Sequence, residues 1–294
     1  DVDQCWEVAL MAKKCGADFV IGIGGGSPID AAKAVAAFAA SDLSIDGLFA
    51  NEYGKNVLPI VAVPTTSGTG SEVTPWAVMT WHKIKSKRAF GGTATFPTVA
   101  MLDPIYTASL PAGITVSTAL DAFAHCFESY ISLSSEPISD AINLYVLKRF
   151  AACMDRIEAG DFDSMREELM LISMMAGTTI SNTGTVLPHA MGYPLTYFYG
   201  VPHGQANIVV FPAFIDALMK HRHERLNEIL DAMNLGAEEL KAFIRRNCSV
   251  DITPKAEELA AWAHETSLLK KIVNTGIPVD EPDLLELYRQ TFSK

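Results

Sequence analysis

The chain has 294 residues, of which 49% are hydrophobic, and its formal net charge is -11. A chain of this length and apolar content buries a large core, which excludes a disordered protein. The acidic balance argues against nucleic acid or a membrane surface as a partner, because either would need a basic face. We therefore expect a small-molecule ligand. The 5 cysteines are scattered without C-x-x-C spacing, which indicates a cytoplasmic location.

The first hundred or so residues alternate between helix and strand patterns. A helix is predicted over Val2–Cys15, buried strands over 18–23, 58–63, 77–81 and 99–102, and an alanine-rich helix from near Pro28. Strand–loop–helix alternation predicts a mostly parallel sheet. The predicted fold class for residues 1–110 is therefore an α/β, Rossmann-like domain.

Beyond Pro111 the pattern becomes helical. Amphipathic helices are predicted over 116–131, 139–159, 164–182 and 205–220, with more to the end and no strand pattern. We expect residues 111–294 to form an all-helical domain.

Two glycine-containing loops follow predicted strands. In "IGIGGGSPID", Gly24, Gly25, Gly26 and Ser27 lie between a strand and a helix start, where free amides favour a phosphate. Alone, this is as well explained by a tight turn, and it is not the G-x-G-x-x-G fingerprint. The second loop is "PTTSGTGSE", at 64–72. Since parallel strands end at one edge of a sheet, the two loops together favour a phosphate or dinucleotide site.

A charge-free run over 169–215 contains His189 and His203. Its prolines and polar residues exclude a membrane helix, so both imidazoles need buried partners. Asp121 and His125, four residues apart, share one helix face. For that pair alone a local hydrogen bond is the better explanation, but one divalent metal would satisfy all four side chains.

These motifs resemble the iron-dependent (group III) alcohol dehydrogenase family. The match depends on "GGGSPIDAAK", "PTTSGTGSE", the D-x-x-x-H of Asp121 and His125, and two histidines fourteen apart that end in "PHG". Their order and separations fit over nearly the whole chain.

The resemblance implies Fe2+, or alternatively Zn2+, held by Asp121, His125, His189 and His203 in a cleft between the two domains. It also implies NAD or NADP, with Gly24, Gly25, Gly26 and Ser27 at the pyrophosphate and Thr65, Thr66, Thr69 and Lys87 along the cofactor. A homodimer is expected on the same basis.

Two departures from the family concern the site. Tyr193 stands where many relatives carry a histidine that assists proton transfer. We predict either that it faces the cleft and relays a proton or that it packs as an aromatic in the helical core. Relatives also begin with a further strand–helix–strand unit, so this chain is expected to lack part of its cofactor domain.

The predicted function is a metal-dependent NAD(P) oxidoreductase that interconverts a small alcohol and its aldehyde or ketone. Alternatives are a zinc enzyme similar to glycerol dehydrogenase or dehydroquinate synthase, and a catalytically idle fragment or scaffold. Tyr197, Phe198 and Tyr199 are predicted either as an apolar pocket wall or as core packing.

Overall fold

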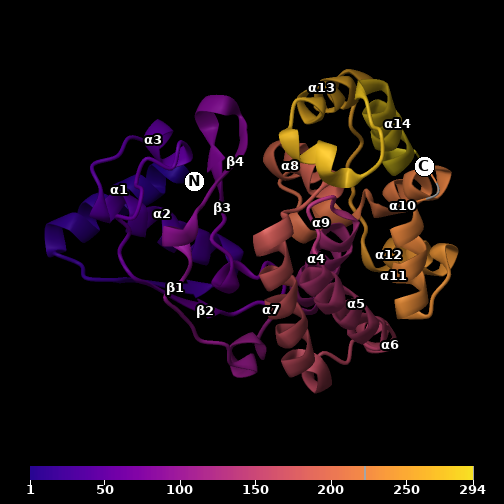
Figure 1. The fold of residues 1–294 in the computed structure, drawn as a ribbon, viewed down its shortest axis with the longest axis horizontal. Coiled ribbons are helices and arrows are strands. Elements are labelled where there is room, and N and C mark those ends of the chain that lie inside the picture. The colour runs from indigo at the N-terminus through magenta and orange to yellow at the C-terminus, as the bar shows by residue number, and fades with distance from the viewer. Residues whose placement is uncertain (222, 294) are drawn as a thin grey trace.

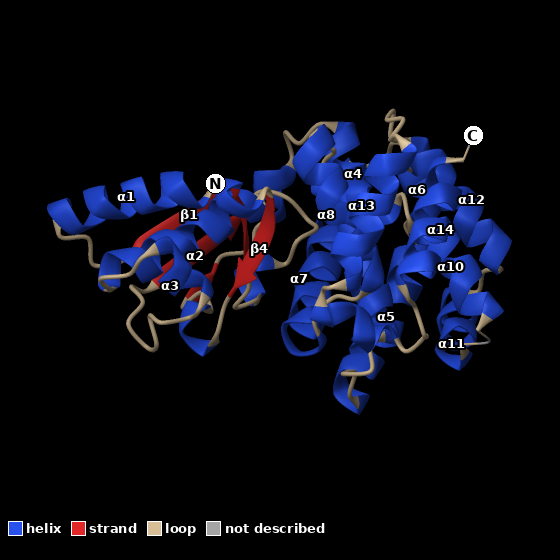
Figure 2. Cartoon of the chain, turned by 90° about the horizontal axis from the view of Figure 1, so that it is seen from above, coloured by secondary structure: helices blue, strands red, loops and turns tan. Residues whose placement is uncertain are grey.

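The computed structural model of the chain describes residues 1–221 and 223–293. The strands of this described part all precede Ala112, where the first long helix of the second half begins. Figure 1 shows the N-terminal half, from indigo to purple, beside the helical half, and Figure 2 shows the strands confined to the former. The predicted α/β and helical parts are confirmed as fold elements.

A parallel sheet forms the centre of the N-terminal half. Strands β1 (Val20–Gly24), β2 (Ile60–Pro64) and β5 (Val99–Ala100) pair in the order β1-β2-β5. The predicted strands exist, although β1 and β2 are shifted toward their C-terminal ends and β5 is shorter than expected. Because both pairs are parallel, the loops after β1 and β2 leave the sheet at one edge.

Helix α2 (Gly26–Ala40) packs on one face of this sheet. Gly22 allows the close approach, because a Cβ there would lie 2.9 Å from the Cβ of Ala32. Helix α1 (Val2–Cys15), with the predicted bounds, packs on α2. The opposite face is open: Ile21 and Ile23 are 51% and 63% exposed. Parallel sheets are usually covered on both faces, so this open apolar face is unusual.

The predicted strand at 77–81 is correct in extent but wrong in placement. Strand β3 (Ala77–Trp81) pairs antiparallel with β4 (Ser86–Phe90) in a separate two-stranded sheet. Strand β4 lies in the lysine-rich segment, where no strand was predicted. Tertiary packing explains the difference, because Phe90 is buried edge-on against Phe49 of α3 (Ile45–Phe49).

The helical half is built around α4 (Ala112–Ile131), which is buried along most of its length. The other helices are α5 (Pro137–Ala151), α6 (Met154–Ala159), α7 (Arg166–Thr183), α8 (Leu187–Tyr199), α9 (His203–Ile208), α10 (Phe211–Lys220), α11 (Glu224–Met233), α12 (Ala237–Asn247), α13 (Ala256–Ser267) and α14 (Glu281–Phe292).

Two predicted helices are each divided in the structure. The segment 139–159 forms α5 and α6, and 205–220 forms α9 and α10, with Pro212 in the first turn of α10. Proline is common in the first turn of a helix, because backbone N–H groups there have no partner within the helix. The charge-free run covers parts of α7 to α10, and none of the helices in the described part of the chain is long and apolar enough to cross a membrane.

A buried lysine connects α2 to the loop after β2. Lys33 is 0% exposed, and its Nζ donates to Ser71 Oγ at 2.8 Å and to the Trp76 carbonyl at 2.7 Å. Asp30 Oδ1 lies 3.8 Å away. Burial lowers the pKa of Lys33 to about 8, so at pH 7 most of the amine keeps its proton.

We predict that Lys33→Met lowers the free energy of unfolding by about 3 kcal/mol, because Asp30 then loses its buried cation. The control is Lys13→Met: Lys13 is partly exposed, donates to the Ser41 carbonyl, and should change stability by less than about 1 kcal/mol. Urea unfolding at pH 7 without ligands measures both. Equal losses in the two variants would contradict the prediction.

Candidate metal and cofactor site

Helix α4 places three polar side chains on one face inside the helical core. Asp121, His125 and Glu128 follow at spacings of four and three residues, and they are 1%, 4% and 0% exposed. Residues at these spacings stack along a helix. Acidic side chains and imidazoles this deeply buried require partners from other elements.

Helix α8 brings His189 against this face. The ligand atoms of Asp121, His125 and His189 all lie within 4.8 Å of one another. His189 Nε2 is 3.6 Å from Asp121 Oδ1, which is too long for a hydrogen bond. The structure therefore gathers three of the four predicted metal ligands around one point.

His203, the first residue of α9, lies at the edge of this cluster. Its ring centroid is 5.4 Å from that of His189. Its Nε2 is 3.1 Å from the Asn207 side-chain amide nitrogen, which also donates to Asp121 Oδ1 at 3.1 Å. His203 Nε2 would bind a metal only after Asn207 releases it.

Two residues of the site, Glu128 and Asn207, were missed by the sequence predictions. Glu128 continues the helix face of Asp121 and His125, and Asn207 follows His203 by one turn of α9. That spacing was the available signal. It did not show that Glu128 accepts a hydrogen bond from His189, or that Asn207 reaches Asp121.

The imidazoles of His125 and His189 each contact an oxygen atom through Nδ1, the ring nitrogen that would not bind the metal. His125 Nδ1 is 3.2 Å from the Gly68 carbonyl, and His189 Nδ1 is hydrogen-bonded to Glu128. A carbonyl can only accept, so His125 Nδ1 carries the proton and Nε2 keeps its lone pair. Outer partners of this kind are typical of metal-binding histidines.

The electrostatics of the cluster favour neutral imidazoles beside an ionised carboxylate. Burial lowers the pKa of His125 and lowers that of His203 to about 3. For Asp121, burial acts to raise the pKa, but His125 and His203 outweigh it and hold the pKa well below its usual range.

His189 behaves in the opposite way. Burial acts to lower its pKa, but the Glu128 and Asp121 carboxylates together raise it to about 9. Two buried carboxylates thus create a potential that favours a cation at this position. His189 Nε2 and His203 Nδ1 are both buried without a hydrogen-bond partner. Imidazole nitrogens and a carboxylate suit a divalent transition metal, so these residues fit the metal that the resemblance implies.

The glycine loop and the second loop meet next to this cluster. A Cβ at Gly25 would lie 3.1 Å from Thr66 Oγ1, and one at Gly26 would lie 2.7 Å from Thr69 Cγ2. Gly24 has φ 142°, which a side chain would strain. No side chain caps the N-terminus of α2, so its backbone N–H groups are free to bind a phosphate.

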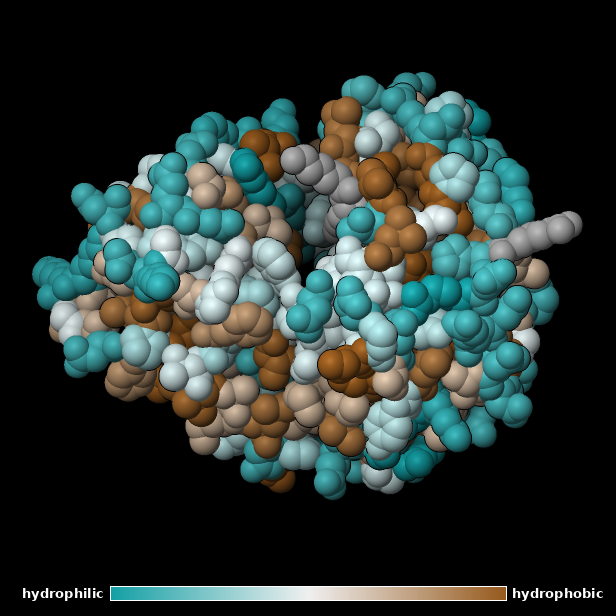
Figure 3. All heavy atoms as spheres, viewed as in Figure 1, coloured by the Kyte–Doolittle hydropathy of each residue, from teal (hydrophilic) through white to brown (hydrophobic). Residues whose placement is uncertain are grey.

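One cavity of about 430 Å³ joins the two groups of predicted residues. Its walls include Gly26, Ser27, Thr69 and Lys87 from the N-terminal half, and His125, His189, Tyr193 and His203 from the helical half. The cavity is not lined by four other predicted residues, Gly24, Gly25, Thr65 and Thr66. Figure 3 shows the surface hollowed between the two halves.

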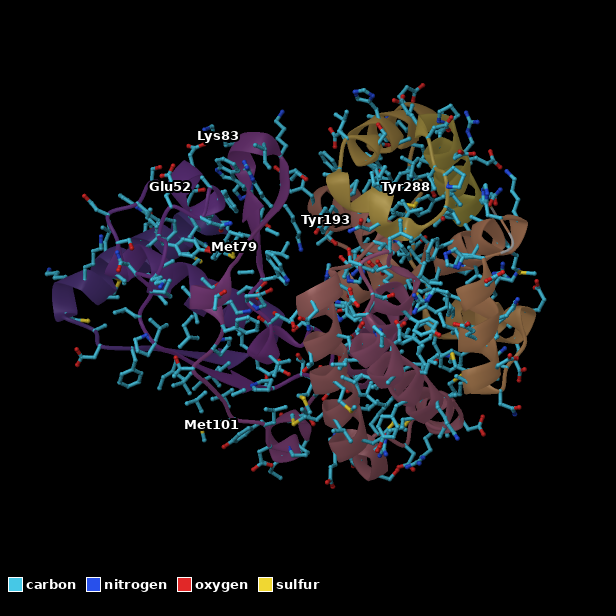
Figure 4. The ribbon with its side chains drawn as sticks, in the orientation of Figure 1. Glu52, Met79, Lys83, Met101, Tyr193 and Tyr288 are labelled. Carbon is cyan, nitrogen blue, oxygen red and sulfur yellow. The ribbon has the colours of Figure 1, made fainter. Side chains whose placement is uncertain are left out.

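Tyr193 faces this cavity from α8, one turn after His189. Figure 4 shows it at the boundary between the β3–β4 hairpin and the helical half. Burial lowers the pKa of Lys87, and the neighbouring Tyr193 acts to raise it. Tyr197 and Tyr199 do not line the cavity: Tyr197 packs near His82, and Tyr199 donates to Glu258. Neither predicted role is met for Phe198 and Tyr199, which are 49% and 36% exposed and so neither line the cavity nor pack in the core.

The glycine turn and the buried Asp/His cluster thus lie at one cavity. Residues 1–104 match the profile of iron-containing alcohol dehydrogenases, and residues 115–275 match the profile of the C-terminal part of that family. The chain belongs to the iron-containing alcohol dehydrogenase family, which confirms the resemblance.

Individual relatives of known name support this family membership. Lactaldehyde reductase of Escherichia coli (strain K12) is 33% identical over 241 residues, which are 80% of this chain and 62% of the relative. Alcohol dehydrogenase 4 of Saccharomyces cerevisiae is 33% identical over 87% of this chain and 69% of the relative. The chain thus spans less than two thirds of the length of the first of these relatives.

Solved structures share the fold. An iron-containing alcohol dehydrogenase from Thermotoga maritima superposes with a TM-score of 0.91 at 33% identity, over 99% of this chain and 80% of the other. Sulfoacetaldehyde reductase from Bifidobacterium kashiwanohense, solved in complex with NAD+, gives 0.87 at 28% identity over 100% and 81%.

Proposed function

We propose that this chain carries the active site of a metal-dependent NAD(P) oxidoreductase that interconverts a small alcohol and its aldehyde or ketone. The observation that carries the proposal is the single cavity of about 430 Å³ that both the glycine turn and the imidazoles line. Hydride transfer needs the substrate carbon beside the nicotinamide, and this cavity offers room for both.

The metal would be held by Asp121, His125, His189 and His203. Membership of the family implies that this metal is iron. Bound there, a divalent ion supplies a Lewis acid that lowers the pKa of an alcohol hydroxyl. With three neutral imidazoles and the Asp121 carboxylate as its ligands, a divalent ion would keep a net positive charge. Glu128, behind His189, reduces that charge without occupying a ligand position.

The N-terminal half would orient the nucleotide. The uncapped N-terminus of α2 at Gly26 and Ser27 supplies amides for the pyrophosphate. Lys87 lines the same cavity and would add a cation near the nucleotide, and Trp76 and Val78 contribute apolar surface that limits water. A bound nicotinamide supplies the hydride acceptor.

The test is NAD(P)H absorbance with a panel of small primary and secondary alcohols, on protein reconstituted with Fe2+ or Zn2+. Metal- and cofactor-dependent reduction of NAD or NADP is expected. Tight metal binding without turnover on any substrate would favour the alternative of a catalytically idle scaffold.

We predict that Tyr193 relays the hydroxyl proton. A phenol with a pKa near ~10 is a poor base at neutral pH, but it can pass a proton through water. Tyr193→Phe keeps the packing and should lower turnover by a factor on the order of 10². Tyr193→His should restore turnover with a pH optimum shifted downward, because imidazole titrates near ~6.5.

Tyr199→Phe is the matched control, because it removes a hydroxyl from the same helix at a side chain that bonds Glu258 outside the cavity. Its rate should equal that of the unmodified chain. If Tyr193→Phe also leaves the rate and its pH profile unchanged, Tyr193 has only a packing role.

A further inference from the structure

Glu128 is a buried carboxylate whose two oxygens each contact a nitrogen from α8 or its N-cap. It is 0% exposed, and its side chain lies on α4 one turn beyond His125. Oε1 accepts from His189 Nδ1, and Oε2 accepts from the Val186 backbone N–H at 2.8 Å. A backbone N–H can only donate, so Oε2 is an acceptor.

The backbone around Val186 is shaped to make this contact. Gly184 has φ 68°, a conformation that favours glycine, and the chain then turns into α8. Val186 is the N-cap of α8, so its N–H precedes the helical hydrogen bonds and is available to Glu128. The loop between α7 and α8 therefore fixes Glu128 and His189 together.

The contact determines which nitrogen of His189 can bind a cation. Since Nδ1 donates to Glu128, the lone pair lies on Nε2 in the neutral ring. This Nε2 points toward Asp121 Oδ1, 3.6 Å away, and has no hydrogen-bond partner of its own. A proton on Nε2 would occupy the position that the cation needs.

We propose that Glu128 is a positioning residue for the metal: it holds His189 in the tautomer with Nε2 open and places a second negative charge behind the ligand set. The proposal rests on the metal site of the proposed function. Outer carboxylates that accept from a ligating imidazole strengthen metal binding in this way.

Glutamine is the informative replacement because it has one acceptor oxygen instead of two. In Glu128→Gln, the amide nitrogen must face either the Val186 N–H or His189 Nδ1. If the oxygen stays on Val186, the amide donates to His189 Nδ1 and forces the proton onto Nε2. If the oxygen moves to His189, the Val186 N–H is left buried without an acceptor.

The experiment is competition of the full chain with a chromophoric chelator for Zn2+, comparing Glu128→Gln with Glu168→Gln. Glu168 is a partly buried carboxylate on α7. It pairs with Arg149, away from the metal site. We expect a Zn2+ affinity 10- to 100-fold weaker in Glu128→Gln, on the order typical of outer-sphere changes, and unchanged in Glu168→Gln. Equal affinity in Glu128→Gln and the unmodified chain overturns the role of Glu128.

Two further measurements keep the outcomes separate. Thermal unfolding without metal detects a purely structural role, which would lower stability while leaving Zn2+ affinity intact. An unmodified chain that binds no Zn2+ refutes the metal site itself and hence the proposed function. Should Glu128→Gln not fold, ¹⁵N NMR of the histidine rings in the Zn2+-loaded unmodified chain decides: His189 protonated on Nδ1 is expected, and His189 bound through Nδ1 contradicts the proposal.

Discussion

Replacing His203 with alanine is expected to remove tight metal binding and to lower turnover by at least about 10³-fold, because a bound Lewis acid lowers the barrier by several kcal/mol. The remaining three ligand residues, Asp121, His125 and His189, lie within 4.8 Å of one another and would keep only weak binding. Metal content after gel filtration and turnover with NAD or NADP measure the two effects.

The control is His264→Ala, which removes an imidazole from α13 whose Nδ1 pairs with Glu281 at the surface. That variant should keep metal and turnover. Stoichiometric metal together with full activity in His203→Ala would remove His203 from the ligand set and leave a site of three side chains.

Placing valine at Gly25 is expected to weaken cofactor binding by at least about 10-fold, which corresponds to about 1.4 kcal/mol. The structure shows how. A side chain at Gly25 would meet Thr66 Oγ1 at 3.1 Å, so the first loop would push the second loop away from the phosphate position. Cofactor fluorescence titration measures the affinity, and metal content should stay near that of the unmodified chain.

A matched pair of variants tests that explanation. Gly236→Val adds the same side chain at a glycine with open space around it in the helical half, and it should leave cofactor affinity unchanged. Combining Gly25→Val with Thr66→Ala should recover part of the affinity lost by Gly25→Val, relative to Thr66→Ala alone. Unchanged cofactor affinity in Gly25→Val would return the glycine loop to the role of a tight turn.

The local elements follow from the sequence because their signals lie within a few neighbouring residues. Helix α1 has its predicted bounds, and β1 and β2 lie where the apolar runs are. Asp121 and His125 share a helix face because helical geometry requires it at a spacing of four. The loops after β1 and β2 meet because neighbouring parallel strands end at one edge.

Contacts between distant segments depended on the tertiary structure. Strand β4 forms because β3 supplies its hydrogen bonds and Phe49 packs against Phe90. The sequence of the lysine-rich segment predicts neither contact.

The site shows the same division between local signal and packing. Sequence chemistry selected Asp121 and the three histidines as metal ligands. The acceptor behind His189 is Glu128, 61 residues away, and the one behind His125 is Gly68, 57 residues away. Such pairs are decided by how α4, α8 and the second loop pack together, since the free energy of a buried hydrogen bond depends on which groups the fold brings within reach.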